Sequence, residues 1–233
     1  YGDIGYNGNP HLITPNLDKF AGESIRFNNF NVSPVCAPTR SSLLTGRYSL
    51  RTGVTDTYNG GAIMSSNEIT LAEIFNENNY KTGIFGKWHL GDNYPSRPSD
   101  QGFQESLIHL SGGIGQVGDF TNYYKGSTSY YDPILWLNNK QEKYNGYCSD
   151  IFTDEAIKFI EDNKDNQFFC YLSFNAPHTP LQVPDKYYQM YKDIDPTNIN
   201  GESLEMTEKN ILDAKKIYGM VTNIDENFGK LIN

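Results

Sequence analysis

Apolar and polar positions along this 233-residue chain follow patterns that predict alternating helices and strands. Short, mainly apolar runs at 81–85 and 168–174 predict two strands, and the second is apolar enough for a central strand covered on both sides. Residues 25–30 alternate only in part and are interpreted as another strand. Helices are predicted at 14–22, 36–46, 70–79, about 150–161 and 211–231. This order predicts an α/β fold with a mostly parallel central sheet flanked by helices, in which loops beyond the strand ends carry the site.

Local signals mark the ends of several predicted helices. Thr14 followed by Pro15 is typical of a helix start, with the threonine as cap and the proline at the first position. Thr70 and Glu73 have the spacing of a capping box. Apolar residues of the last helix recur at helical spacing, which we interpret as a core-facing stripe and not as a cofactor site.

Residues 92–148 are rich in Tyr, Gly, Ser and Asn and are interpreted as a loop-rich excursion over the sheet. One hairpin is predicted within it, where residues 134–137 meet a turn at 138–139. Four tyrosines of this segment could form a sugar-stacking surface or pack within the loop, and packing is the favoured interpretation. They are Tyr123, Tyr124, Tyr130 and Tyr131. We find no repeat and no linker, so 1–233 is interpreted as part of a single domain.

Composition excludes several classes of partner. The formal net charge is −9 and no basic stripe offsets it, which argues against binding to nucleic acid or to an anionic membrane. No apolar run approaches the length needed to span a bilayer. Of the three cysteines, Cys148 and Cys170 could form a disulfide, but two buried free thiols are the favoured interpretation.

The stretch 36–47 places a cysteine at the start of a short helix, with an arginine one turn further on. Pro38 suits the first turn of a helix and Gly46 suits its end. Cys36 then lies at the positive end of the helix dipole, where anionic oxygens are favoured. The alternative is a small buried cysteine, which is what most isolated cysteines are.

This stretch resembles the signature of the type I sulfatases, which belong to the alkaline phosphatase superfamily. In that signature Cys-x-Pro-Ser/Thr-Arg is followed by Leu-Thr-Gly-Arg or Leu-Thr-Gly-Lys, and every defining position is filled here. The resemblance implies that a maturation enzyme oxidises Cys36 to formylglycine, whose aldehyde hydrates to a gem-diol. One diol oxygen would attack the sulfur of a sulfate ester, and the second hydroxyl would then expel sulfate.

Residues 86–91, Gly-Lys-Trp-His-Leu-Gly, follow a predicted strand and place Lys87 and His89 on one side of an extended loop. Alone, a lysine or histidine is usually a solvated surface group. The run nevertheless resembles the second sulfatase signature, which ends in Gly-Lys and an aromatic residue before His. That signature usually opens with Gly-Tyr, whereas this chain has Asn79 and Tyr80. The departure precedes the strand and leaves the assignment of the site residues largely untouched.

His178 lies between Pro177 and Pro180, which stiffen its loop. It is either a turn histidine without a role or the histidine of the Pro-His-x-Pro element that it resembles in the sulfatases. In that family this histidine reaches the sulfate.

The resemblance implies a catalytic set of Cys36, Arg40, Lys87, His89 and His178. Arg40 would support the region of the diol and the metal. Lys87 and His178 would bind the sulfate oxygens, and His178 would share protonation of the leaving oxygen. His89 would hydrogen-bond the diol and take its proton when sulfate is expelled.

A divalent cation, Ca²⁺ or Mg²⁺, is also implied by the resemblance. Residue 36, as formylglycine, would supply one ligand. The remaining carboxylate and amide ligands are expected outside this chain, in an Asp-Asp pair before it and an Asp-Asn-Gly run after it. Because the chain begins in a turn-like run at Tyr1 and ends uncapped at Asn233, we interpret it as a fragment, incomplete at both ends, and expect it to be inactive in isolation.

Three alternative functions remain open from the sequence. They are a formylglycine-dependent phosphate or phosphonate ester hydrolase, a catalytically silent sulfatase-like binding protein, and a hydrolase that uses the cysteine thiol itself. The expected substrate class is arylsulfatase-like, with sulfated carbohydrate as one possibility. A periplasmic, lysosomal or secreted location is implied by resemblance alone.

Overall fold

The computed structural model describes residues 2–116, 129–199 and 201–233. The chain divides into two compact units. Residues 30–175 form the continuous unit, and residues 1–29 with 176–233 form the split unit. The prediction that residues 1–233 belong to a single domain stays a prediction.

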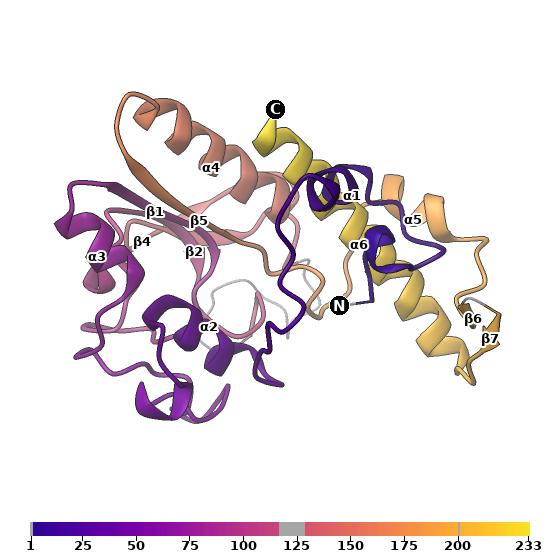
Figure 1. Ribbon diagram of the computed structural model, residues 1–233, viewed down its shortest axis with the longest axis horizontal. Coiled ribbons are helices and arrows are strands. Elements are labelled where there is room, and N and C mark those ends of the chain that lie inside the picture. The colour runs from indigo at the N-terminus through magenta and orange to yellow at the C-terminus, as the bar shows by residue number, and fades with distance from the viewer. Residues whose placement is uncertain (1, 117–128, 200) are drawn as a thin grey trace. The chain divides into compact units, whose positions relative to one another are not determined.

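The continuous unit contains a five-stranded sheet with the order β4-β3-β2-β1-β5 (Figure 1). Strand β1 pairs in parallel with β2 on one side and β5 on the other, and β3 and β4 add an antiparallel hairpin beside β2. The strands are β1 (Lys81–Lys87), β2 (Glu105–His109), β3 (Ile134–Leu137), β4 (Lys140–Lys143) and β5 (Phe168–Ser173).

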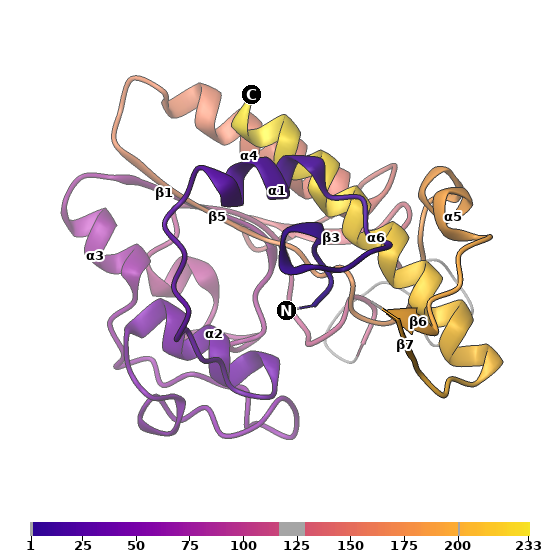
Figure 2. The same cartoon turned by 45° about the vertical axis from the view of Figure 1, so that its right-hand side comes forward.

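Helices cover both faces of this sheet (Figures 1 and 2). On one face lies α4 (Cys148–Asn163), where the ring of Phe159 packs 5.5 Å from that of Phe85. On the other face lie α2 (Cys36–Thr45) and α3 (Leu71–Glu77), whose Leu44 and Ala72 join Ile84 of β1 in one buried cluster. Full burial of a leucine or isoleucine side chain stabilises a fold by about 2 kcal/mol. The predicted α/β class, with a mostly parallel sheet between helices, is confirmed.

Within the described residues there are also three short 3₁₀ helices. They are η1 (Gly5–Asn7), η2 (Ser49–Arg51) and η3 (Pro98–Gln101).

Local sequence signals predicted several elements well. The capping box of α3 is present, with Thr70 Oγ1 accepting from the N–H of Glu73 and the Glu73 carboxylate accepting from the N–H of Thr70. Gly46 ends α2 in the left-handed conformation, with φ of 67°. The predicted hairpin around Asn138 and Asn139 is confirmed, and both asparagines have positive φ, as its tight turn requires.

Three strand predictions are corrected by the structure. The excursion 92–148 does not only pass over the sheet, because Glu105–His109 forms β2 inside it. Strand β5 lies at an edge of the sheet formed by the described residues and is mostly half-buried, so it is not a central strand there. Residues 25–30 form no strand, since Ile25 and Phe27 are exposed and no described strand pairs with them.

The described cysteines are all free thiols, so the alternative of a disulfide between Cys148 and Cys170 is wrong. Cys148 is buried and Cys170 is half-buried. Burial raises the pKa of both thiols, that of Cys170 to about 12. Two of the four tyrosines of the predicted cluster, Tyr123 and Tyr124, lie outside the described residues.

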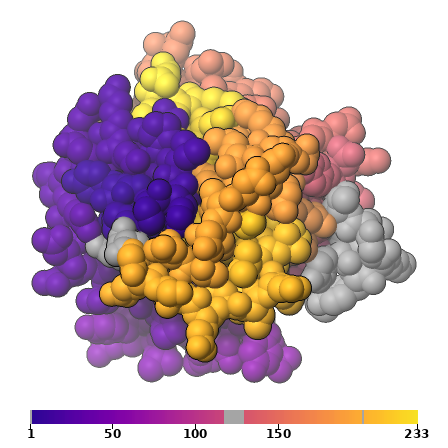
Figure 3. Space-filling view, turned by 90° about the vertical axis from the view of Figure 1, so that its right-hand side faces the viewer, coloured from indigo at the N-terminus to yellow at the C-terminus, as the bar shows by residue number. Residues whose placement is uncertain are grey.

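The split unit joins residues from both ends of the chain (Figure 3). Its longest element is α6 (Glu208–Ile232), which packs against α1 (Pro15–Gly22) and α5 (Asp185–Tyr191). A two-stranded hairpin is made by β6 (Asn198–Ile199) and β7 (Glu202–Ser203). The predicted apolar stripe of the last helix packs into the core of this unit, with Tyr218 and Val221 buried beside Leu12 and Tyr191.

The start of α1 is capped by a residue 209 positions away. The fully buried carboxylate of Asp225 accepts hydrogen bonds from the backbone N–H groups of Asn16 and Leu17, at 3.2 and 2.7 Å, and from the Asn16 side chain at 2.8 Å. Thr14 occupies the N-cap position as predicted, but its hydroxyl accepts from the N–H of Gly5 and donates to the carboxylate of Asp18, and it accepts no backbone N–H of the helix. Among the described residues, no helix has both the length and the apolar character for a bilayer crossing.

Candidate active site

Helix α2 presents Cys36 as its first residue. Val35 before it is extended, with φ of −126° and ψ of 160°, so the chain turns into the helix at the cysteine. Ala37, Ser41 and Leu44 are buried and fix one side of α2 against the fold. Cys36 itself is half-buried and thus stays open to a reacting molecule.

His89 brings its imidazole to Cys36 from the loop that follows β1. Its Nδ1 lies 3.3 Å from Cys36 Sγ, and its Nε2 lies 2.9 Å from the carbonyl oxygen of Thr57. A carbonyl oxygen can only accept, so the neutral ring carries its proton on Nε2 and leaves Nδ1 as an acceptor toward Cys36. The backbone of His89 has φ of 58°, an uncommon conformation for a residue with a side chain.

The surroundings of His89 favour the neutral imidazole. Burial is the largest cause and lowers the pKa of His89 to about 4, and the positive charge of Lys87 acts in the same direction. The Thr57 carbonyl and the Asp92 carboxylate oppose this shift but do not outweigh it. At neutral pH this side chain is therefore able to accept a proton.

Arg40 links α2 to the loop that carries Lys87 and His89. Its Nε donates to the carbonyl oxygen of Trp88 at 2.7 Å, and its Nη2 donates to the carbonyl oxygen of Lys87. The guanidinium carbon also lies 5.7 Å from the centre of the Tyr171 ring, within the range of a cation–π contact. Burial lowers the pKa of Arg40, while the nearby Tyr171 and Cys36 raise it. These contacts fix the position of the loop relative to Cys36.

Lys87 is the last residue of β1, and its side chain turns toward the segment that follows β2. Its Nζ donates to the carbonyl oxygen of Gly112 at 2.5 Å, and the residue is only 4% exposed. Gly112 also lies against His89, because a Cβ added at Gly112 would be 2.8 Å from Cε1 and 3.0 Å from Nε2 of the imidazole. Gly112 thus lies against the side chains of both Lys87 and His89.

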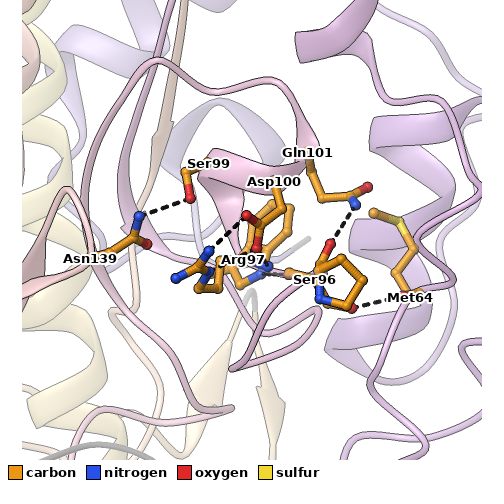
Figure 4. A network of polar contacts seen from close by, with 9 residues as sticks. Met64, Ser96, Arg97, Ser99, Asp100, Gln101 and Asn139 are labelled. Atoms are coloured by element: carbon orange, nitrogen blue, oxygen red, sulfur yellow. Dashed lines mark hydrogen bonds and ion pairs between the residues drawn. The ribbon is translucent and has the colours of Figure 1, made fainter.

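The indole of Trp88 anchors the same loop to the chain that follows it, whose Ser96, Arg97 and Asp100 are shown in Figure 4. Trp88 Nε1 donates to the carbonyl oxygen of Ser96 at 2.9 Å, and Ser96 Oγ donates to that of Met64 at 3.4 Å. Arg97 and Asp100 close the next turn through two side-chain hydrogen bonds of 2.8 and 2.9 Å. The fully buried indole thereby holds the backbone between Lys87 and His89.

The structure therefore brings together four of the five predicted site residues, namely Cys36, Arg40, Lys87 and His89. The fifth, His178, belongs to the split unit, where it is half-buried and its Nδ1 lies 2.7 Å from the carbonyl oxygen of Thr179. The catalytic roles of all five residues stay predictions.

The described residues do not by themselves fit a divalent metal ion. Among them, no group of three or more histidine, cysteine, aspartate or glutamate side chains is arranged to hold one. The charges that act on His89 come from the cations Lys87 and Arg40 and from one carboxylate, Asp92. Ca²⁺ takes about six to eight oxygen ligands, so this set lacks the donors that it requires. The implied Ca²⁺ or Mg²⁺ stays a prediction.

Sequence reasoning missed Thr57 and Gly112, which act on the site through carbonyl oxygens. Every residue has a carbonyl, so no side-chain pattern could have revealed these two. The only signal in the sequence was the Gly112-Gly113 pair. This pair follows strand β2, which the sequence pattern did not predict. Ser111, the residue before Gly112, is itself buried.

The site lies at the carboxyl ends of parallel strands, as expected for an α/β protein whose loops carry the chemistry. A similar fold is found in a crystal structure of Ps i-CgsB in complex with k-i-k-neocarrahexaose, which has a TM-score of 0.79 and 32% identity. The match covers 100% of this chain and 51% of that one. The fold is thus the alkaline-phosphatase-like fold of the sulfatases.

A family model described as Sulfatase matches residues 1–233. The chain belongs to the sulfatase family. An uncharacterized sulfatase of Schizosaccharomyces pombe is 32% identical over 232 residues, which are 90% of this chain and 41% of the relative. The N-acetylglucosamine-6-O-sulfatase of Bacteroides thetaiotaomicron is 38% identical over 178 residues, 74% of this chain and 27% of that protein. The chain therefore spans less than half the length of these two relatives.

Proposed function

We propose that the protein containing this chain hydrolyses sulfate esters of carbohydrates. The observation that carries the proposal is the 3.3 Å approach of His89 Nδ1 to Cys36 Sγ at the start of α2, in a member of the sulfatase family. The carbohydrate part is supported by the relative named for N-acetylglucosamine-6-O-sulfate chemistry and by the similar structure that holds a neocarrahexaose.

The nucleophile in this proposal is formylglycine, made from Cys36 by a maturation enzyme. When hydrated, this group supplies an oxygen nucleophile together with a second hydroxyl. Its oxygens would lie near the present position of Sγ, within reach of Nδ1 of His89. Because that nitrogen is the unprotonated one, His89 takes a proton from residue 36 as general base. General bases of this kind contribute about 10² to 10⁴ in rate.

Charge neutralisation falls to the cations of the site. Sulfate esters react slowly because negative charge accumulates on the sulfuryl and leaving oxygens, so fixed positive charge beside them lowers the barrier. Lys87 is assigned to the sulfate oxygens, together with His178. Arg40 is assigned to positioning, because its donors hold the Lys87 and Trp88 carbonyls.

A divalent metal ion remains part of the proposal by family resemblance, with formylglycine 36 as its one ligand from the described residues. A periplasmic, lysosomal or secreted location is proposed on the same basis. Neither is needed for the assignments to His89, Lys87 and Arg40 given above.

The first test is mass spectrometry of the tryptic peptide 27–40 from the full-length protein made in its own host. We expect an aldehyde in place of the thiol at residue 36, while the peptides that contain Cys148 and Cys170 keep their thiols and serve as internal controls. An intact Cys36 thiol in protein that is active on sulfate esters would contradict the formylglycine assignment.

The choice of ester is tested on the same preparation. p-Nitrophenyl sulfate, phosphate and phenylphosphonate esters share one leaving group, so their kcat/KM values compare the transferred group alone. We expect the sulfate ester to be the best of the three. A preference for the phosphonate or phosphate ester would establish the rival hydrolase, and turnover of none would favour a silent binding protein.

A further inference from the structure

A polar cavity of about 510 Å³ lies beside the candidate active site, within the continuous unit. His89 forms part of its wall, so the same imidazole faces Cys36 through Nδ1 and borders this cavity. Three segments supply the rest of the lining, namely 57–63, 91–92 and 111–116. The cavity is therefore placed to hold the part of a substrate that extends away from residue 36.

The side chains of this lining offer hydrogen bonds and one aromatic face. Asn59 and Gln116 carry amides, Asp92 carries a carboxylate, and Tyr58 is 64% exposed. Asn59 has φ of 51°, a conformation that asparagine tolerates better than most residues with side chains. Amides and a carboxylate around one exposed aromatic ring suit a sugar, which presents hydroxyls at its edge and C–H groups on its face.

The charged side chains around the cavity indicate which sugars it can accept. Within the part of the chain that the structure describes, the cavity lining contains no lysine or arginine, and Asp92 is its one acidic side chain. Lys87 lies outside the lining and donates to the carbonyl oxygen of Gly112, which does belong to it. A second sulfate or a carboxylate in the cavity would meet a like charge at Asp92 and no cation among the described lining residues.

We propose that this cavity is the subsite for the sugar that carries the scissile sulfate, that it accepts a ring without a second negative charge, and that Asp92 enforces this choice. The inference rests on the proposed function and adds to it that the sugar ring of the substrate has no negative charge besides the scissile sulfate. A carboxylate accepts hydrogen bonds from two neighbouring hydroxyls of a neutral ring, and it repels an anionic substituent at either position.

The test compares three substrates on the mature full-length enzyme. They are a neutral hexose monosulfate, the corresponding hexose disulfate, and p-nitrophenyl sulfate, which has no sugar hydroxyl. For the wild type we expect the monosulfate to have a kcat/KM at least about tenfold above that of the disulfate. This corresponds to the loss of one hydrogen bond to a charged group.

The decisive variant is Asp92→Asn, which removes the charge and keeps the size of the side chain. We expect the monosulfate-to-disulfate ratio of kcat/KM to fall by about tenfold, and the ratio of monosulfate to p-nitrophenyl sulfate to fall as well. Gln116→Ala should lower the second ratio without changing the first. Asp162→Asn, at an exposed acid on α4, is the matched control and should change neither ratio.

The outcomes separate this inference from the proposed function. If the wild type hydrolyses sulfate esters but Asp92→Asn leaves both ratios unchanged, or if the wild type prefers the disulfate, the subsite is wrong and the proposed function stands. If the wild type hydrolyses none of the three substrates, the proposed function and the subsite are both wrong.

Discussion

At the scale of single residues, two backbone carbonyls determine how the titratable groups of the site behave. The carbonyl of Thr57 fixes the tautomer of His89, and the carbonyl of Gly112 receives the ammonium of Lys87. Both histidine and lysine can rotate away when such an acceptor is lost. The orientations of the His89 and Lys87 side chains are thus set by the backbone carbonyls of residues to which no catalytic role is assigned.

Gly112 provides a direct test of this arrangement. The substitution Gly112→Ala places a methyl group 2.8 Å from Cε1 of His89, so the ring must move by several tenths of an ångström. We expect kcat of the full-length enzyme on a sulfate ester to fall by about 10- to 100-fold, because small displacements of catalytic groups cost rates of this order. Steady-state kinetics on p-nitrophenyl sulfate measures the effect.

The matched control for that variant is Gly22→Ala, at a glycine whose added Cβ meets nothing within 4 Å. It should retain kcat within about twofold, as expected of a surface substitution. Unchanged kcat in Gly112→Ala would show that the position of the imidazole is not critical.

The residue scale also shows which parts of the site could be predicted from the sequence. Cys36, Arg40, Lys87 and His89 belong to motifs of side chains at fixed spacing, and the structure brings these four together. Thr57 contributes only a carbonyl oxygen, and its contact with His89 joins positions 32 residues apart. Such a contact depends on the fold and leaves no mark in the sequence.

At the scale of elements, predictions succeeded where the signal is local. They failed where a segment becomes a strand, or takes its place in the sheet, through pairing with another strand. Helix α3 follows from its capping box, which lies within four residues. Strand β2 has the mixed sequence Glu-Ser-Leu-Ile-His, which lacks strict alternation and becomes a strand because β1 pairs with it. Strand β5 is apolar although it lies at an edge, because α4 and α3 both pack against it.

The pairing of β1 with β5 depends on Gly86, for which we make a second prediction. A Cβ at this position would lie 1.9 Å from the carbonyl oxygen of Ser173, and φ is 122°, outside the range of residues with side chains. We expect Gly86→Ala to lower the free energy of unfolding by about 3 kcal/mol or more, since strain and the clash add.

Urea denaturation of the chain followed by circular dichroism measures this loss. Gly2→Ala, at a glycine with open space around it, serves as control and should change the free energy of unfolding by less than about 0.5 kcal/mol. If Gly86→Ala had the same urea midpoint as the wild type, β1 and β5 could move apart at this position without loss of stability.

At the scale of the whole molecule, the split unit depends on contacts between the two ends of the chain. Asp225 on α6 receives three hydrogen bonds from Asn16 and Leu17 at the start of α1. A buried carboxylate needs such donors to compensate for its lost hydration. The continuous unit has its own sheet and its own buried cluster.

The third prediction concerns the hydrogen bonds between Asp225 and the start of α1. Asp225→Asn turns one of the two acceptor oxygens into a donor that faces backbone N–H groups, so we expect it to destabilise the split unit by about 2 kcal/mol. Hydrogen exchange should show faster exchange at the amides of Asn16 and Leu17 and no change in β1.

Asp213→Asn on the same helix is the matched control, because Asp213 pairs with Lys209, whose side chain is 81% exposed, and such pairs contribute little. Equal protection of the α1 amides in Asp225→Asn and in the wild type would show that the carboxylate is not needed as a cap.

The division of the chain also sets the order in which its two units can complete their folding during synthesis on the ribosome. Residues 30–175 are contiguous, so every partner in the continuous unit has emerged once that stretch is complete. Residues 1–29 emerge before this stretch, yet α6, which caps and covers α1, is translated after it. The segment 1–29 must therefore wait, with Phe20 and other apolar side chains uncovered, until α6 has been translated.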